Sequence, residues 1–181
     1  MKADIYDDVY RYIGNRKLIS LLKLLITNPG FLYIFFIRKY QSSNFTLIKL
    51  FLMILSRVLV IIFHFQIPLS TKIGKGLYIG HFGAIIINPK AELGKNINIA
   101  NGVTIGQENR GLREGTPVIG DEVWIGTNAV IVGKIKIGNN VLIAPNSYVN
   151  FDVPDNSIVL GNPGKVIDNL TATKDYINRK V

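Results

Sequence analysis

An apolar residue recurs every six positions through much of the chain, and this period constrains the fold more than any other feature of the sequence. A period of six fits neither an amphipathic helix nor an alternating strand. Short repeats of this kind stack into solenoids, because one unit cannot bury its own apolar face. The repeat breaks twice, with two extra residues near Gly83–Ile86 and a longer insertion at Gln107–Thr116. The positions that keep the period are Ile73, Ile79, Ile87, Leu93, Ile99, Ile105, Ile119, Ile125, Ile131, Ile137, Ile143 and Val149.

Glycine follows several of these residues, as at Gly120, Gly126 and Gly138, and the repeat resembles that of the hexapeptide-repeat acyltransferases. The resemblance implies a mainly β fold, a left-handed parallel β-helix whose triangular prism has one hexapeptide on each face, preceded by an N-terminal α-helical region. Asn28-Pro29-Gly30-Phe31 and Lys72-Ile73-Gly74 resemble motifs of the serine O-acetyltransferase branch. We expect the helical region at residues 1–65, the prism at 66–168 and a C-terminal tail at 169–181.

The formal net charge is +9, and most of it lies in the first third of the chain. Residues 1–65 hold nine Lys and Arg against three Asp, a net of +6, in the most apolar part of the sequence. A nucleic-acid-binding protein would instead gather basic and aromatic residues on one surface, so we expect no nucleic-acid partner. The charge favours an anionic membrane surface or substrate. The chain has no cysteine, which fits a cytoplasmic protein.

Residues 15–27 predict an amphipathic helix that ends at Asn28-Pro29-Gly30, and residues 45–65 predict a longer, more apolar one. Lys49, Arg57 and His64 argue against a membrane span, because charged residues are costly inside a bilayer. These residues fall on one stripe of the helix. Two interpretations stay open: a helix packed on three sides by neighbouring helices and the prism end, or an interfacial helix at the inner leaflet. We expect the region to adhere to the inner face of the membrane.

His81 occupies the third position of a hexad, beside the first break in the repeat. The resemblance implies that this histidine is the general base, which takes the proton of an acceptor hydroxyl while the oxygen attacks the thioester of acetyl-CoA. The alternative is an incidental residue at a corner of the prism. Gln66 lies fifteen residues earlier, where the serine enzymes have an aspartate, and its amide would orient the imidazole.

The resemblance also implies where acetyl-CoA binds. The pantetheine would contact main-chain groups near Gly126, Thr127, Ala144 and Pro145, and Lys165 would lie near the nucleotide phosphates. No metal is expected at the site.

The insertion after Gly106 carries Asn109, Arg110 and Arg113, which can hydrogen-bond an acceptor, although a solvated loop is the plainer interpretation. Two positions differ from the serine enzymes. Gly80 replaces an aspartate that holds the substrate amine, and Thr116 replaces a histidine of the carboxylate-binding triplet. From these losses we predict that the acceptor is a sugar hydroxyl in surface polysaccharide biosynthesis (capsule, exopolysaccharide or lipopolysaccharide), with serine O-acetylation as the alternative.

Two other classes of protein share this repeat. A metalloenzyme with a three-histidine site is excluded, because the chain has two histidines and no cysteine. A non-catalytic β-helix scaffold stays open, and an absence of coenzyme A binding would identify it. The resemblance further implies a homotrimer, with each active site in the groove between two neighbouring prisms.

Overall fold

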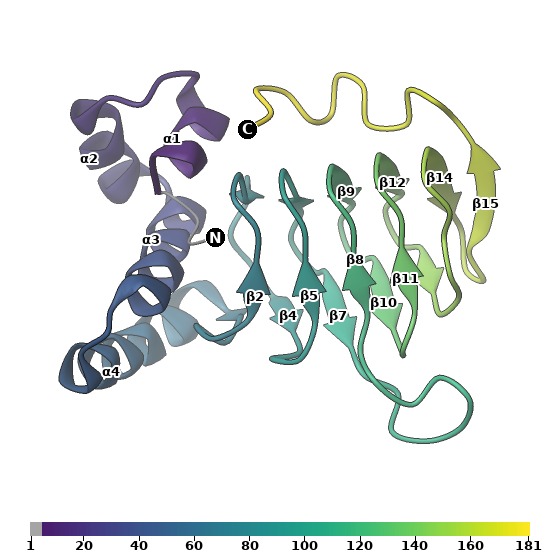
Figure 1. Ribbon diagram of the computed structural model, residues 1–181, viewed down its shortest axis with the longest axis horizontal. Helices are drawn as coiled ribbons and strands as arrows, with labels where there is room; N and C mark the ends of the chain where they lie inside the picture. The colour runs from purple at the N-terminus through teal and green to yellow at the C-terminus, as the bar shows by residue number, and fades with distance from the viewer. Residues whose placement is uncertain (1–4) are drawn as a thin grey trace.

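A three-sided parallel β-helix forms the body of the molecule, and helices cover its N-terminal end in the computed structural model, which describes residues 5–181 (Figure 1). The prediction of a mainly β hexapeptide-repeat fold with an N-terminal helical region is therefore confirmed. Residues 1–4 of the expected helical region lie outside the described residues.

Each side of the prism is a sheet of short strands stacked in parallel. Face A consists of β1 (Phe65–Gln66), β4 (Ile85–Ile87), β7 (Thr104–Gly106), β10 (Val130–Val132) and β13 (Tyr148–Val149). Face B consists of β2 (Lys72–Ile73), β5 (Glu92–Leu93), β8 (Val118–Ile119) and β11 (Lys136–Ile137). Face C consists of β3 (Tyr78–Ile79), β6 (Asn98–Ile99), β9 (Val123–Ile125), β12 (Val141–Ile143), β14 (Ser157–Leu160) and the antiparallel β15 (Lys165–Asp168).

The hexad positions form the core of the prism. All twelve of the in-register aliphatic residues are buried, and the strand register places equivalent positions side by side, as for Ile131 between Ile105 and Val149. Burial of a column of aliphatic side chains is what holds successive coils together, because one coil has no interior of its own. The period of six thus reports the spacing between the inward-pointing residues of adjacent faces.

The turns between faces stack into three edges of the prism. The C–A edge consists of residues 80–84, 100–103, 126–129 and 144–147, and the turn of the β14–β15 hairpin at 161–164 continues it. The B–C edge consists of residues 74–77, 94–97, 120–122, 138–140 and 154–156. The A–B edge carries the predicted insertion, which leaves the prism between β7 and β8 as the long loop in Figure 1.

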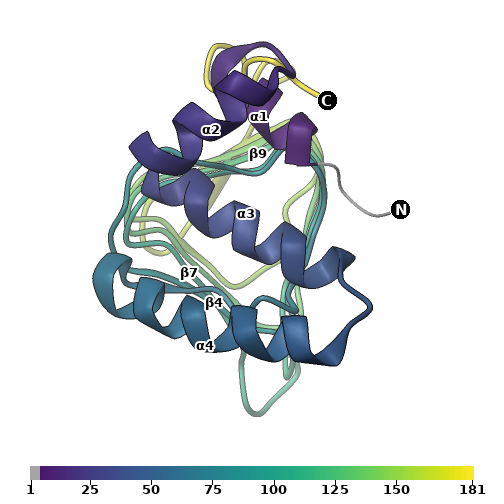
Figure 2. The same cartoon turned by 90° about the vertical axis from the view of Figure 1, so that its left-hand side faces the viewer.

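Helices α1 (Ile5–Ile13), α2 (Leu18–Thr27), α3 (Pro29–Ser42) and α4 (Thr46–Phe63) lie across the first coil (Figure 2). The predicted break at Asn28 is present, and α2 and α3 meet there at 116°. The Asn28 side chain caps α3 by accepting a hydrogen bond from the N–H of Phe31 (2.8 Å), and Pro29 occupies the first turn. This motif therefore starts a helix as well as ending one.

A buried ion pair joins the helices to the prism. The Arg38 guanidinium contacts the Asp8 carboxylate (2.7 Å) and donates to the carbonyls of Ile73 and Gly74, while Asp8 also accepts from the N–H groups of the next turn. Burial raises the pKa of Asp8, and its hydrogen bond and charge interaction with Arg38 act in the opposite direction. Removing one partner would leave a buried charge unpaired, so this pair fixes the helices on the first coil.

Helix α4 does not pack on three sides as one interpretation of the sequence held. It contacts α3 and β1, and within this helix, all of which the structure describes, Ser56 alone is buried. Of its twelve exposed residues, ten are Leu, Ile, Phe, Met or Val. The side of α4 that packs against the protein is the one that carries Ser56, which belongs to the polar stripe. The apolar residues on the rest of the helix stay uncovered.

Candidate active site

The C–A edge brings together most of the residues that the sequence singled out. Successive turns are joined there by backbone hydrogen bonds from Gly102 to Ala84 (2.6 Å), from Asn128 to Asn101 (3.1 Å) and from Asn146 to Thr127 (2.9 Å). This ladder places Gly126 and Thr127 beside Ala144 and Pro145, on the same edge as His81. Lys165 is exposed and follows the last turn of that edge at the start of β15.

His81 directly follows β3 and Gly80, and the helical region fixes the end of this strand. The Tyr12 hydroxyl bonds both the carbonyl (2.9 Å) and the N–H (2.8 Å) of Ile79. Gly30 of α3 lies so close that an added Cβ would come within 2.3 Å of the Ile79 carbonyl oxygen, a distance that backbone atoms cannot accommodate without moving. The Asn-Pro-Gly-Phe motif therefore places the backbone that precedes His81.

The other side of the His81 turn is attached to the C-terminus of α4. The N–H of Gly83 donates to the Phe63 carbonyl (3.3 Å), the N–H of Ile85 donates to the His64 carbonyl (3.2 Å), and the rings of Phe63 and Phe82 lie 6.3 Å apart. His64 ends α4 in a left-handed conformation (φ 59°), and it holds the His81 turn through its backbone carbonyl. The two extra residues of the first register break form this attachment.

The His81 side chain is exposed, and no hydrogen-bond partner for it is found among residues 5–181. Gln66 lies on β1, with its side chain on the outer surface of face A opposite Ile86, and it is not hydrogen-bonded to His81. Within one chain the imidazole is thus free to meet an acceptor, and its proposed orientation by Gln66 stays a prediction.

Asn109, Arg110 and Arg113 lie at a different edge. Their loop is closed by paired backbone hydrogen bonds between Glu108 and Gly115 (3.1 and 3.0 Å), and Arg113 forms an ion pair with Glu108 (3.4 Å). The loop projects from the A–B edge, whereas His81 lies on the C–A edge. The structure therefore does not bring the predicted acceptor-binding residues to the predicted base within a single chain.

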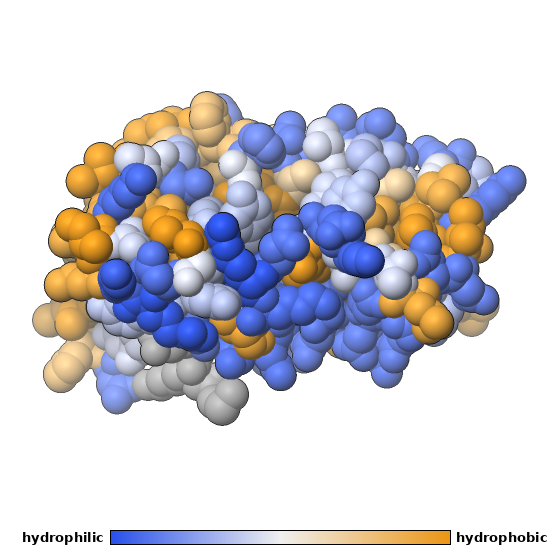
Figure 3. Space-filling view, turned by 90° about the horizontal axis from the view of Figure 1, so that it is seen from above, coloured by the Kyte–Doolittle hydropathy of each residue, from blue (hydrophilic) through white to orange (hydrophobic). Residues whose placement is uncertain are grey.

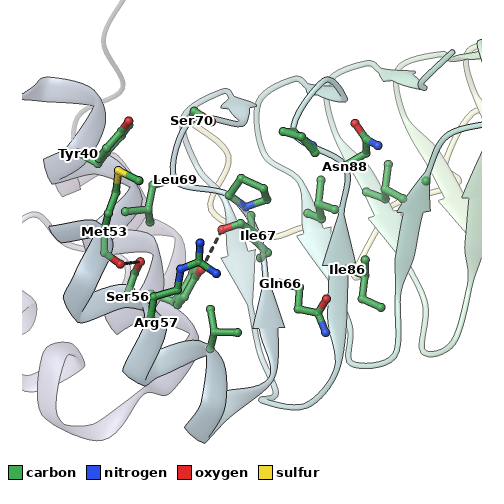
Figure 4. A pocket seen from close by; sticks show the side chains of 17 residues that line it. Tyr40, Met53, Ser56, Arg57, Gln66, Ile67, Leu69, Ser70, Ile86 and Asn88 are labelled. Carbon is green, nitrogen blue, oxygen red and sulfur yellow. Dashed lines mark hydrogen bonds between the residues drawn. The ribbon is translucent and has the colours of Figure 1, made fainter. Parts of the chain in front are cut away.

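A cavity of about 570 Å³ lies between α4 and face A, and no motif in the sequence predicted it (Figure 4). Its walls are mostly apolar, and its polar groups include Arg57, Gln66 and Asn88. The Tyr33 hydroxyl at its wall donates to the Ile67 carbonyl (2.8 Å), and burial raises the pKa of Tyr33 to about 12. Arg57 belongs to the polar stripe noted in the sequence, but the stripe alone does not indicate a cavity.

The C-terminal tail at 169–181 covers the B–C edge. It forms successive turns and runs back over the coils toward α1 (Figure 1). The Asn140 side chain bonds the backbone of Leu170 and Thr173, the rings of Trp124 and Tyr176 lie 4.9 Å apart, and Asn96 exchanges two hydrogen bonds with the backbone of Val181.

Comparison with known proteins agrees with this geometry. Residues 116–150 match the family model described as bacterial transferase hexapeptide (six repeats). A serine acetyltransferase of Staphylococcus aureus is 37% identical over 116 residues, which are 63% of this chain and 54% of that protein. The serine acetyltransferase of Neisseria gonorrhoeae in complex with serine is 31% identical with a TM-score of 0.70, covering 90% of this chain and 67% of that chain.

The chain belongs to the hexapeptide-repeat acyltransferase family. It falls in the serine O-acetyltransferase-like branch, as the resemblance implied. A serine acetyltransferase from Brucella abortus in complex with coenzyme A has the same fold, with a TM-score of 0.74 and 25% identity over 91% of this chain and 66% of that chain. The chain spans about half the length, or less, of the curated relatives that it matches.

These relatives overturn the predicted sugar acceptor and the assignment to surface polysaccharide biosynthesis, because they are serine acetyltransferases and one of them holds serine. The prediction rested on two missing charge partners, at Gly80 and Thr116. It treated recognition of serine as depending on these two positions alone. Two missing charge partners do not identify a different acceptor, because other groups can pair the same charges.

Proposed function

We propose that this chain is an acetyl-CoA-dependent O-acetyltransferase whose acceptor is L-serine. The observation that carries the proposal is the position of His81, exposed at the head of the C–A edge, in a chain whose fold and sequence match serine acetyltransferases solved with serine and with coenzyme A. The non-catalytic alternative would leave this exposed histidine and the uncovered edge beside it without a role.

His81 acts as the general base in this proposal. It accepts the proton of the serine hydroxyl as the oxygen forms its bond to the thioester carbonyl carbon. The carbon–sulfur bond then breaks, and His81 returns the proton to the sulfur of the departing coenzyme A. The products are O-acetylserine and coenzyme A, so no oxidant, reductant or metal is needed.

Coenzyme A is proposed to lie along the C–A edge. Its pantetheine would follow the turns that contain Gly126, Thr127, Ala144 and Pro145, and the nucleotide phosphates would reach Lys165 at the end of the edge. The course of the tail supports this proposal, because the tail covers the B–C edge and leaves the C–A edge open.

A homotrimer is proposed as the active form, since family members with this β-helix are generally trimeric. Parallel prisms around a threefold axis set one edge of each chain against a different edge of its neighbour. The loop with Asn109, Arg110 and Arg113 would then approach the His81 of the next protomer. We propose that the trimer is located in the cytoplasm and binds peripherally to the inner face of the membrane.

The decisive experiment follows the release of the coenzyme A thiol from acetyl-CoA with purified protein. L-serine should stimulate release, whereas O-methyl-L-serine, which lacks the hydroxyl, should not. Light scattering on the same sample should give the mass of three chains. Coenzyme A binding without serine-dependent release would contradict the proposed acceptor, and an absence of coenzyme A binding would favour a scaffold.

A further inference from the structure

Helix α4 turns its apolar side away from the protein, the reverse of the arrangement in a helix on the surface of a soluble domain. Leu47, Ile54 and Ile61 recur at seven-residue intervals on one stripe and are 80%, 62% and 74% exposed. Ser56 is buried, and its hydroxyl donates to the Met53 carbonyl (2.8 Å). The ammonium of Lys49 lies 5.3 Å from the centre of the Tyr40 ring of α3.

The apolar surface extends to α2, where Leu18, Ile19, Leu22 and Ile26 are exposed. Both helices lie at the N-terminal end of the molecule, and Figure 3 shows hydrophobic side chains concentrated at that end, on the left of the view. Of the 24 large hydrophobic residues that are exposed in residues 5–181, 15 lie between Leu18 and Ile62. Helix α3 lies between α2 and α4 in Figure 2, so the exposed apolar residues flank it on both sides. Apolar exposure on this scale marks an interaction surface.

The charged residues of α2 and α4 are all positive. The sequence from Val9 to Ala91 holds eleven Lys and Arg and not one Asp or Glu. Lys17, Lys23 and Arg57 are exposed on or beside the two helices, and none of the three has an acidic partner within 4.0 Å among the described residues. The surface therefore complements negative charge.

Charge and shape together select one kind of partner. A second copy of this surface, packed face to face around a twofold axis, would bring the same lysines toward each other. An anionic bilayer offers hydrocarbon for the apolar side chains and phosphate for the basic ones. By length and composition α4 could cross a membrane, but its contacts with α3 and its direct continuation into β1 hold it against the prism.

We propose that the outward faces of α2 and α4 form a docking surface for an anionic lipid bilayer, on which the two helices lie in the plane of the interface. The prism then stands with its N-terminal end toward the lipid. His81 lies on the first coil, in the turn that is bonded to the C-terminus of α4, and the exposed Phe82 follows it. The active edge thus begins next to the membrane. This inference deepens the proposed localisation and does not depend on acetyl transfer.

The test is sedimentation of the full chain with phosphatidylcholine vesicles, with and without 30 mol% phosphatidylserine as the anionic probe, at about 0.05 and 0.5 M salt. We expect most of the protein to pellet with the anionic vesicles at low salt, and less at high salt because screening weakens the attraction of lysine for phosphate. Recovery in the supernatant under all conditions would overturn the proposal. Equal binding to neutral vesicles would overturn its electrostatic part.

Two matched pairs of variants locate the surface. Leu47→Gln/Ile54→Gln/Ile61→Gln should lower the partition coefficient at least about tenfold, because three apolar side chains no longer enter the bilayer. The control Leu160→Gln/Ile167→Gln/Leu170→Gln changes exposed apolar residues at the opposite end of the prism and should bind as the parent does.

Lys17→Glu/Lys23→Glu should lower binding at low salt at least about tenfold. Lys136→Glu/Lys174→Glu, an equal charge change on the prism and tail, should leave binding unchanged. Light scattering without lipid completes the test. A Leu47/Ile54/Ile61 variant with a smaller assembly mass and unchanged vesicle binding would show that another copy of the chain covers α4, and it would contradict the proposal.

Discussion

Two edges of the same prism differ in whether another part of the chain covers them. At the B–C edge the tail bonds Asn96 and Asn140, and beside it Asn98 of β6, so that the chain itself covers the turns. At the C–A edge the turns bond only to one another along much of the edge, and His81, Pro145 and Lys165 are exposed. Equivalent turns of one repeat can therefore serve structure on one edge and remain available for a ligand on another.

The largest effect is expected from His81 on the open edge. His81→Ala should lower turnover roughly 10²–10⁴-fold, the usual contribution of a positioned general base, while coenzyme A binding changes little. Steady-state kinetics and calorimetry measure the two quantities. The control is His64→Asn, which keeps a residue suited to the left-handed conformation of position 64 (φ 59°) and should keep near-parent turnover. Full acetyl transfer by His81→Ala would refute the proposed base.

The second prediction concerns the acceptor at the same edge. Gly80→Asp should lower the KM for serine about tenfold relative to Gly80→Asn, because a carboxylate can pair with the serine ammonium and an amide of the same shape cannot. Each variant must move the Tyr78 ring, which lies 2.9 Å from the position of an added Cβ, so the two share that cost. Identical KM values would show that the amine of serine is bound elsewhere.

The third prediction compares one lysine from each edge. Lys165→Ala should weaken coenzyme A binding about threefold to tenfold, since one charged hydrogen bond to a phosphate is lost. Lys180→Ala breaks an exposed ion pair with Glu122 at the covered edge and should leave binding unchanged. Calorimetric titration measures both constants. If Lys180→Ala weakened coenzyme A binding more than Lys165→Ala did, the nucleotide would bind at the B–C edge, and the proposed site would be wrong.

The smallest expected effect on activity comes from the covered edge. Asn140→Gly removes hydrogen bonds to Leu170 and Thr173 and should lower stability by about 1–2 kcal/mol with turnover unchanged within about twofold. Asn146→Gly is the matched control, because it has a similar positive φ (60° against 51°) at the open edge. The difference in melting temperature between the two variants measures the contribution of the tail contact. Equal melting temperatures would show that this contact does not stabilise the protein.

The prism could be predicted from the sequence because its pattern is local. Residues such as Ile131 and Ile137 are six positions apart, and the same spacing that appears in the sequence turns the chain from one face to the next. The insertion after Gly106 could be located for the same reason, since a break in a strict period marks the place where the chain leaves the coil.

The arrangement of the helices and the tail could not be predicted in this way. The stripe of polar residues on α4 was visible in the sequence, but which side meets the protein depends on packing against α3 and β1. Asn96 and Val181 are 85 positions apart, and no periodicity connects them. The candidate site shows both cases, because the hexad register predicts that His81 lies at a turn of the prism, whereas the cavity beside Arg57 required the fold.

The comparison of the two edges is tested most directly by hydrogen exchange with and without coenzyme A. We predict slower exchange on binding in peptides that contain residues 126–129 and 144–147, at the C–A edge, and unchanged exchange in residues 169–181. Protection confined to the tail, with the C–A edge unaffected, would contradict the account.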